Sequence, residues 1–90
     1  MFVCGNTDID VRNIPLDYNW IAQDLDGKIW IYENKPVRRN TSWDIDQSLG
    51  SQMVNRIQED FDLNEFWYSS LVKIPRLKNA LERILNDDAN

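Results

Sequence analysis

The sequence predicts one small α+β domain spanning residues 1–90, with a small antiparallel sheet built on a β-hairpin at residues 20–33. Ninety residues is the length of a single small domain with one core. Within residues 20–33, two runs of β-branched and aromatic residues flank an Asp-Gly turn, which is typical of a hairpin. Apolar residues recur at helical spacing near residues 48–60 and 75–86, so two helices are expected to pack on the sheet.

The hairpin strands are predicted at residues 20–24 and 28–33, joined by a three-residue connection in which Gly27 takes a positive φ. The register follows if Asp24 pairs with Lys28 across the connection. It gives four further facing pairs: Trp20 and Tyr32, Ile21 and Ile31, Ala22 and Trp30, and Gln23 and Ile29. Because successive side chains point to opposite faces, both faces are apolar, and each needs a cover from the helices or from another molecule.

The segments around the hairpin are less regular. Residues 1–17 are expected to form a loosely held N-terminal arm whose apolar side chains lie against the sheet. Residues 42–46 are expected to add a short third strand that places Trp43 and Ile45 on the same side. Residues 61–74 are left open between strand and helix, because their apolar residues alternate imperfectly.

Both predicted helices are inferred from apolar spacing. In residues 48–60, Ser48 is a candidate N-cap and Gly50 weakens the prediction. The apolar positions of that segment are Leu49, Met53, Val54 and Ile57. In residues 75–86, Pro75 suits a first helical turn. A single apolar stripe follows it: Leu77, Ala80, Leu81, Ile84 and Leu85.

The residue types exclude several kinds of chemistry. The chain contains one cysteine and no histidine, so an intramolecular disulfide and histidine-activated serine or cysteine nucleophiles are excluded. The same composition disfavours a zinc site, and no glycine-rich phosphate loop is present. The sequence therefore predicts a protein that is not an enzyme and that carries no metal and no cofactor.

The charge pattern bears on the class of partner. Fifteen acidic and ten basic residues give a net charge of −5, and the basic residues are scattered. A nucleic-acid-binding surface normally concentrates basic residues, so direct binding of nucleic acid is not expected. The sequence shows no secretion signal and no long apolar run, so no membrane association is expected. The lone cysteine suits a reducing cytoplasm.

One group of residues is the leading candidate for a partner-binding surface. It consists of Tyr32, Arg38, Arg39 and Trp43. Tyrosine, tryptophan and arginine are the residue types that dominate the hot spots of protein interfaces. A 90-residue chain also needs large residues for its core, so part of its aromatic content must be buried.

Three alternatives remain open at this stage. An acidic patch would imitate the phosphates of DNA and inhibit a nucleic-acid-binding protein; its residues are Glu59, Asp60, Asp62 and Glu65. Asp44 and Asp46 would point to the same side of a strand, as a magnesium-dependent hydrolase or nuclease requires. A homodimer or a homo-oligomeric structural component would cover the second sheet face with a copy of the chain.

Several motifs occur together in a distinctive order. A Tyr-Asn-Trp-Ile-Ala segment precedes an Asp-Gly turn, an aromatic strand ending in Glu-x-x-Pro, a later tryptophan and a closing Trp-x-x-Ser-Leu. The residues concerned are Tyr18, Asn19, Trp20, Ile21, Ala22, Asp26, Gly27, Tyr32, Glu33, Pro36, Trp43, Trp67, Ser70 and Leu71. In this order they resemble small proteins encoded by bacteriophages and prophages. Residues 47–60 and the segment after Pro75 depart from that pattern.

The resemblance implies a biological setting rather than a chemical activity. It implies a small phage-type accessory protein, located in the bacterial host cytoplasm, that binds a host protein. We expect inhibition of a bacterial defence or host factor by steric occlusion. No activity or residue role carries over from the resemblance, so the group around Tyr32 and Trp43 remains a prediction from the residues alone.

Overall fold

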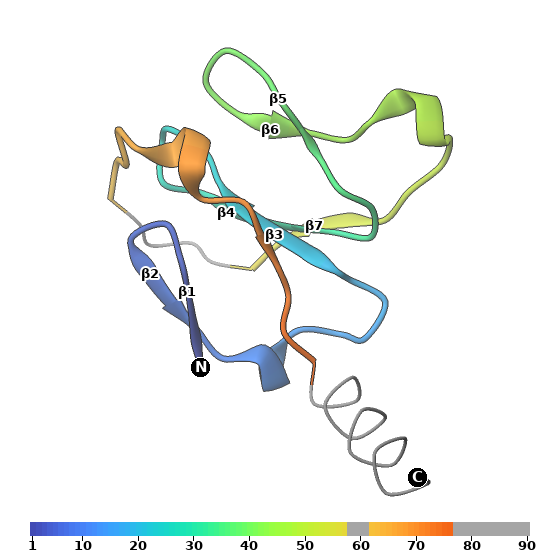
Figure 1. Cartoon of the computed structure of the whole chain (residues 1–90), viewed down its shortest axis with the longest axis horizontal. Helices are drawn as coiled ribbons and strands as arrows, with labels where there is room; N and C mark the ends of the chain where they lie inside the picture. The colour runs from blue at the N-terminus through green and yellow to red at the C-terminus, as the bar shows by residue number, and fades with distance from the viewer. Residues whose placement is uncertain (58–61, 77–90) are drawn as a thin grey trace, which may run out of the picture.

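The computed structural model describes residues 1–57 and 62–76 of the chain. These residues form eight short strands and three 3₁₀ turns, with no α-helix among them (Figure 1). The described part of the chain is therefore a small all-β fold, and the predicted α+β class is wrong for it. Within the same ranges, no helix is long and apolar enough to cross a membrane.

The centre of the fold is a four-stranded antiparallel sheet. Its strands are β3 (Trp20–Gln23), β4 (Ile29–Tyr32), β7 (Val54–Arg56) and β8 (Val72–Lys73), in the order β7-β4-β3-β8. β3 and β4 are the central pair, and β7 and β8 are added at the edges. The predicted hairpin is thus the core of a wider sheet.

The register of the β3–β4 hairpin is the one predicted. All four facing pairs, from Trp20 with Tyr32 to Gln23 with Ile29, occur in the structure. The Asp24 N–H donates to the carbonyl of Lys28 over 2.9 Å, and the Gly27 N–H donates to the carbonyl of Asp24 over 2.9 Å. Gly27 has a φ of 93°, which few residues other than glycine adopt.

The isoleucine-rich face of the sheet is covered by a second hairpin. It is formed by β1 (Phe2–Cys4) and β2 (Thr7–Ile9), joined by Gly5 and Asn6. After β2, the 3₁₀ turn η1 (Val11–Asn13) leads the chain on along the sheet. The buried core on this side consists of Cys4, Ile9, Ile14, Ile21, Ile29, Ile31 and Ile74. The segment expected to be a loosely held arm therefore supplies three core residues.

A buried glutamine connects the first hairpin to the sheet. Gln23 Oε1 accepts the Asn6 N–H over 3.1 Å and an Asn64 side-chain N–H over 2.7 Å. Gln23 Nε2 donates to Asn6 Oδ1 over 2.7 Å and to the Gly27 carbonyl over 2.9 Å. These four hydrogen bonds offset the cost of burying the amide, which is fully enclosed.

The single cysteine lies in this core. Cys4 is fully buried, and its thiol contacts the carbonyl of Ser70 at 3.5 Å. Burial raises the pKa of the thiol to about 12, because the thiolate would lose its hydration. The residue therefore behaves as a small core side chain.

The aromatic face is covered by a third hairpin. Among the strands that the structure describes, β5 (Val37–Arg38) and β6 (Trp43–Asp44) pair only with each other, and the 3₁₀ turn η3 (Trp67–Ser69) adds the buried Trp67. In Figure 1 the central sheet lies between this hairpin and the β1–β2 hairpin. The predicted third strand does form at β6, but it lies over the sheet rather than in it.

The predicted helix at residues 48–60 is wrong for residues 48–57. A 3₁₀ turn, η2 (Gln47–Leu49), ends at Gly50, whose φ of 77° is not helical. β7 then pairs with β4, which gives its backbone sheet hydrogen bonds in place of helical ones. Of the four apolar residues that suggested a helix, Leu49, Met53 and Val54 are exposed, whereas Ile57 packs against the core.

The remaining predictions fall partly beyond the described residues. Residues 62–74 contain η3 and β8, so this segment, which was left open, includes a strand paired with β3. The predicted helix at residues 75–86 lies outside the described residues except for Pro75 and Arg76. Arg76 donates to the carbonyls of Ile14, Pro15 and Tyr18, which ties the end of the described chain to the N-terminal segment.

Candidate binding site

A cavity lined by two of the predicted site residues lies between the aromatic face of the sheet and the β5–β6 hairpin. Its volume is about 410 Å³. Its lining residues are Asp24, Trp30, Tyr32, Ser42, Trp43, Asp44, Ile45 and Val54. We call it the aromatic cavity. Its size is in the range of pockets that hold a small ligand or a single side chain.

Each wall of the aromatic cavity comes from a different element. β4 supplies Trp30 and Tyr32, which share a face because they are two residues apart. β6 supplies Trp43 from the opposite side. Asp24 follows the end of β3, and Val54 begins β7. The cavity therefore exists only because the third hairpin is held above the sheet.

Trp43 is fixed in place by contacts at both ends. Its backbone N–H donates to Asp24 Oδ1 over 2.8 Å. Its indole Nε1–H donates to the carbonyl of Trp67 over 3.2 Å, and the two indoles are edge to face with centroids 6.1 Å apart. The half-buried Trp43 ring is thus preorganised at the cavity wall.

Asp24 is an acidic residue in the wall of the aromatic cavity. Only 9% of the residue is exposed, and loss of hydration raises its pKa above the ordinary value. The Trp43 N–H acts in the opposite direction and favours the ionised form. Three ion pairs occur among the described residues, and none includes Asp24.

Tyr32 is buried at the cavity wall. It is 2% exposed, and burial is the main reason why its pKa is raised. The nearby Asp24 and Asp44 carboxylates raise its pKa further, because a phenolate would repel them. The phenol therefore stays neutral over the physiological pH range.

The structure divides the predicted partner-binding group into two parts. Tyr32 and Trp43 line the aromatic cavity, whereas Arg38 and Arg39 are exposed on the third hairpin and do not line it. Arg39 Nε lies 3.7 Å from Asp44 Oδ2, so its guanidinium lies beside the cavity edge. Arg38 faces Trp43 across the hairpin register. All four residues thus belong to one side of the molecule.

Trp30 and Asp24 line the aromatic cavity but were not predicted as site residues from the sequence. Trp30 was placed on the same face as Tyr32, and that register was the signal that could have identified it. Asp24 was predicted only as the end of the first hairpin strand, paired with Lys28. No local signal marks its side chain, because its partner Trp43 comes from a distant hairpin.

The carboxylates considered for an enzyme have separate structural roles. Asp46 Oδ1 accepts the Ser48 N–H over 3.1 Å and the Ser48 hydroxyl over 2.6 Å, which caps η2. Asp44 accepts the Ile45 N–H and lies near Arg39. β6 ends at Asp44, so the strand alternation that would align the two carboxylates does not extend to Asp46.

The proposed acidic patch is only partly described. Asp62 and Glu65 are exposed, and Glu59 and Asp60 lie outside the described residues. Among the described residues, no group of three metal-ligating side chains is close enough to hold an ion.

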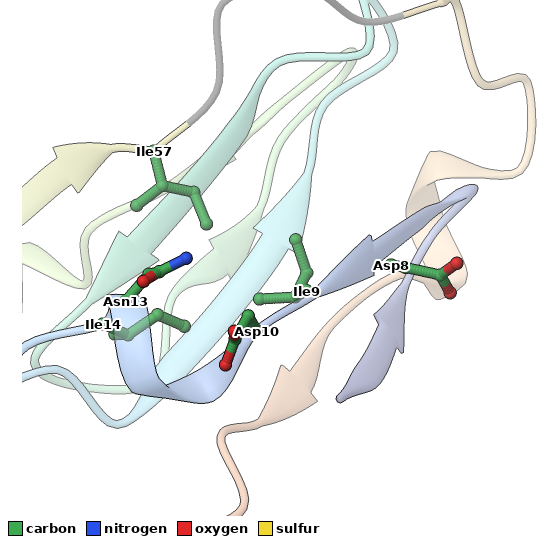
Figure 2. Close-up of a pocket in the computed structure, with 6 residues that line it drawn as sticks. All are labelled: Asp8, Ile9, Asp10, Asn13, Ile14 and Ile57. Atoms are coloured by element: carbon green, nitrogen blue, oxygen red, sulfur yellow. The ribbon is translucent and has the colours of Figure 1, made fainter.

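A second cavity of about 170 Å³ lies beside η1. Its lining residues are Asp8, Ile9, Asp10, Asn13, Ile14 and Ile57. Figure 2 shows that the Asp8 carboxylate points away from Asp10 and Asn13. Asp10 is already paired with Arg12 at 2.8 Å, and this hydrogen-bonded pair lowers the Asp10 pKa to about 2. These polar groups do not converge on a common point, so this cavity is a weaker candidate.

No protein-family model matches the sequence, and no curated protein or solved structure is significantly similar to it. Function is therefore inferred from the aromatic cavity and the arginines beside it.

Proposed function

We propose that this chain is a non-enzymatic protein-binding domain that contacts its partner through the third hairpin and the aromatic cavity. The observation that carries the proposal is the cavity of about 410 Å³ with Trp43 in its wall and exposed Arg38 and Arg39 beside it. Tryptophan and arginine are the residue types most enriched among interface hot spots.

The preorganisation of the site supports binding. The contacts of Trp43 with Asp24 and Trp67 hold the indole in place before a partner arrives. A side chain that is already ordered loses less conformational entropy on binding, which leaves more of the contact energy for affinity. The exposed arginines beside it would add charge-assisted hydrogen bonds to acidic or carbonyl groups of the partner.

The proposed setting is a bacterial cell infected by, or carrying, a phage. The order of motifs from Tyr18 to Leu71 resembles small phage and prophage proteins, and proteins of that kind act in the host cytoplasm. We infer that the partner is a host protein. The bound domain would cover the functional surface of that protein and so inhibit its defence or regulatory activity. The inhibition is steric and needs no bond-making step.

The proposal is tested by charge reversal beside the cavity. The double variant Arg38→Glu with Arg39→Glu is compared with a matched control, Arg56→Glu with Lys73→Glu, which changes the net charge equally on the edge strands β7 and β8. Both variants and the wild type are used to capture partners from host lysate, followed by mass spectrometry and titration of the purified partner. We expect a loss of about tenfold or more in affinity for the first variant only.

Two outcomes would contradict the proposal. One is equal capture by the wild type and both double variants. The other is a complex that dissociates in moderate salt and is insensitive to Arg38 and Arg39, which would favour the acidic DNA-mimic alternative, since screening weakens purely electrostatic contacts.

A further inference from the structure

We infer that the aromatic cavity receives an arginine side chain of the partner protein. This inference rests on the proposed function and assigns the chemistry of its central contact. The cavity combines two indoles, Trp30 and Trp43, with the carboxylate of Asp24. Aromatic faces and a carboxylate around one space are the groups that attract an organic cation.

The Asp24 carboxylate forms no ion pair in the part of the chain that the structure describes, although the Lys28 charge favours its ionised form from further away. Its Oδ1 accepts the Trp43 N–H, and no lysine or arginine nitrogen of residues 1–57 and 62–76 lies within 4.0 Å of the carboxylate. Asp24 is only 9% exposed as a residue, and burying an ionised carboxylate is unfavourable unless a cation pairs with it. A guanidinium entering the cavity would supply that pair.

The same face of the sheet already holds a cation over an indole. The Lys35 ammonium lies 5.6 Å from the centroid of the Trp20 ring. Trp20 and Trp30 point to the same side of the β3–β4 hairpin, because Trp20 faces Tyr32 and Ala22 faces Trp30. The indole of Trp30 lines the aromatic cavity, so a cation inside the cavity would lie beside an indole of this same face.

The geometry favours arginine over lysine. A guanidinium is flat, is weakly hydrated, stacks on aromatic rings and donates in parallel to a carboxylate, whereas an ammonium retains its hydration more strongly. The chain's own Arg39 does not fill the role, because it is half exposed and pairs with Asp44 at the cavity edge. The cavity therefore remains open to an arginine from the partner.

The inference is tested on the full chain with small probes. N-acetyl-arginine amide is titrated while the indole N–H signals of Trp30 and Trp43 are followed by NMR. N-acetyl-citrulline amide, which has nearly the same shape and no charge, is the matched probe, and N-acetyl-lysine amide is the second cation. We expect saturable shifts with the arginine probe at about millimolar concentration and affinity weaker by about tenfold or more for the other two.

Variants of the chain test whether the Asp24 carboxylate binds the arginine probe. Asp24→Asn keeps an oxygen for the Trp43 N–H and removes the charge, so the arginine probe should bind about tenfold more weakly. Trp30→Leu removes one aromatic wall and should have a similar effect. Asp8→Asn, on the β1–β2 hairpin, is the control and should bind as the wild type does. Retained backbone amide signals show that each variant is folded.

The outcomes separate this inference from the proposed function. Equal binding of the arginine and citrulline probes, equal binding of the arginine and lysine probes, or unchanged binding by Asp24→Asn would overturn it. If partner capture is lost with the Arg38 and Arg39 variant but unchanged with Asp24→Asn, the protein-binding function stands and the arginine pocket does not. If neither variant alters capture, the proposed function itself fails.

Discussion

Asp24 shows how one residue of a turn acquires a role through a distant segment. Its backbone closes the β3–β4 connection, because its N–H donates to Lys28 and its carbonyl accepts from Gly27. Its side chain instead binds the backbone of Trp43 and so holds the third hairpin over the sheet. The backbone role was predictable from the Asp-Gly turn, whereas the side-chain role depends on a contact that no local pattern encodes.

The burial of Asp24 gives a pH-dependent prediction. Because its folded-state pKa is raised, the ionised form destabilises the folded state, and this loss of stability develops as the pH rises through the raised pKa. We expect Asp24→Asn to have a higher free energy of unfolding than the wild type at pH 7. The difference should vanish below the ordinary value of 3.8, where both side chains are neutral.

Urea denaturation of both proteins from pH 3 to pH 8 measures this difference, and the exposed Asp17→Asn serves as the control variant. A stability difference that does not change with pH would show that the Asp24 carboxyl does not titrate as its environment indicates.

For Gln23, the sequence predicted the position of the side chain but not its hydrogen-bond partners. Its position on the isoleucine-rich face followed from the hairpin register. Its buried hydrogen bonds with Asn6 and Asn64 could not be predicted, because these partners are far from it in sequence and meet only in the fold. Polar residues in a core are specified by long-range contacts of this kind.

At the scale of elements, sequence patterns predicted correctly only the structure that residues close together in the chain determine. The β3–β4 hairpin was predicted with its register because one glycine turn and two β-rich runs determine it. β7 was predicted as helix because Leu49, Met53 and Val54 are spaced as in a helix. In the structure, pairing with the free edge of β4 outweighs that weak preference, and Gly50 interrupts the segment.

The β1–β2 hairpin is expected to be an integral part of the core. Ile9 is buried against the sheet, so Ile9→Ala should lower the free energy of unfolding by about 2–5 kcal/mol. Val3 is exposed on the same hairpin, and Val3→Ala should change it by no more than about 0.5 kcal/mol. Urea unfolding followed by tryptophan fluorescence measures both values.

If Ile9→Ala does not fold, the milder Ile9→Val should still cost about 0.5–1.5 kcal/mol. Equal effects at positions 3 and 9 would mean that this hairpin does not cover the sheet in solution.

For the molecule as a whole, the described residues form three layers of β-structure whose order follows long-range pairings. Trp20 pairs with Lys73, and Tyr32 with Val54, so the sheet is complete only when its edges are brought in from distant segments. The α+β class was wrong because periodicity reports on one segment at a time and carries no information about such pairings. The aromatic cavity, which depends on the stacking of two layers, was unpredictable for the same reason.

This topology predicts slow folding for so short a chain. Contacts distant in sequence must form before the sheet is stable, and the loss of chain entropy precedes the gain from packing. We expect refolding on the order of milliseconds to seconds, measured by stopped-flow dilution from urea with tryptophan fluorescence. Microsecond refolding, as in small helical bundles, would indicate that local structure dominates instead.

The enclosed thiol of Cys4 has a practical consequence for studying the domain. Since the chain has no other cysteine and this one is shielded, an added surface cysteine can be labelled selectively in the native protein. Asn40→Cys, at the exposed tip of the third hairpin, would carry a fluorophore or crosslinker two residues from Ser42 of the cavity wall. The native sequence thus already provides a background suited to site-directed spectroscopy, without removal of any residue.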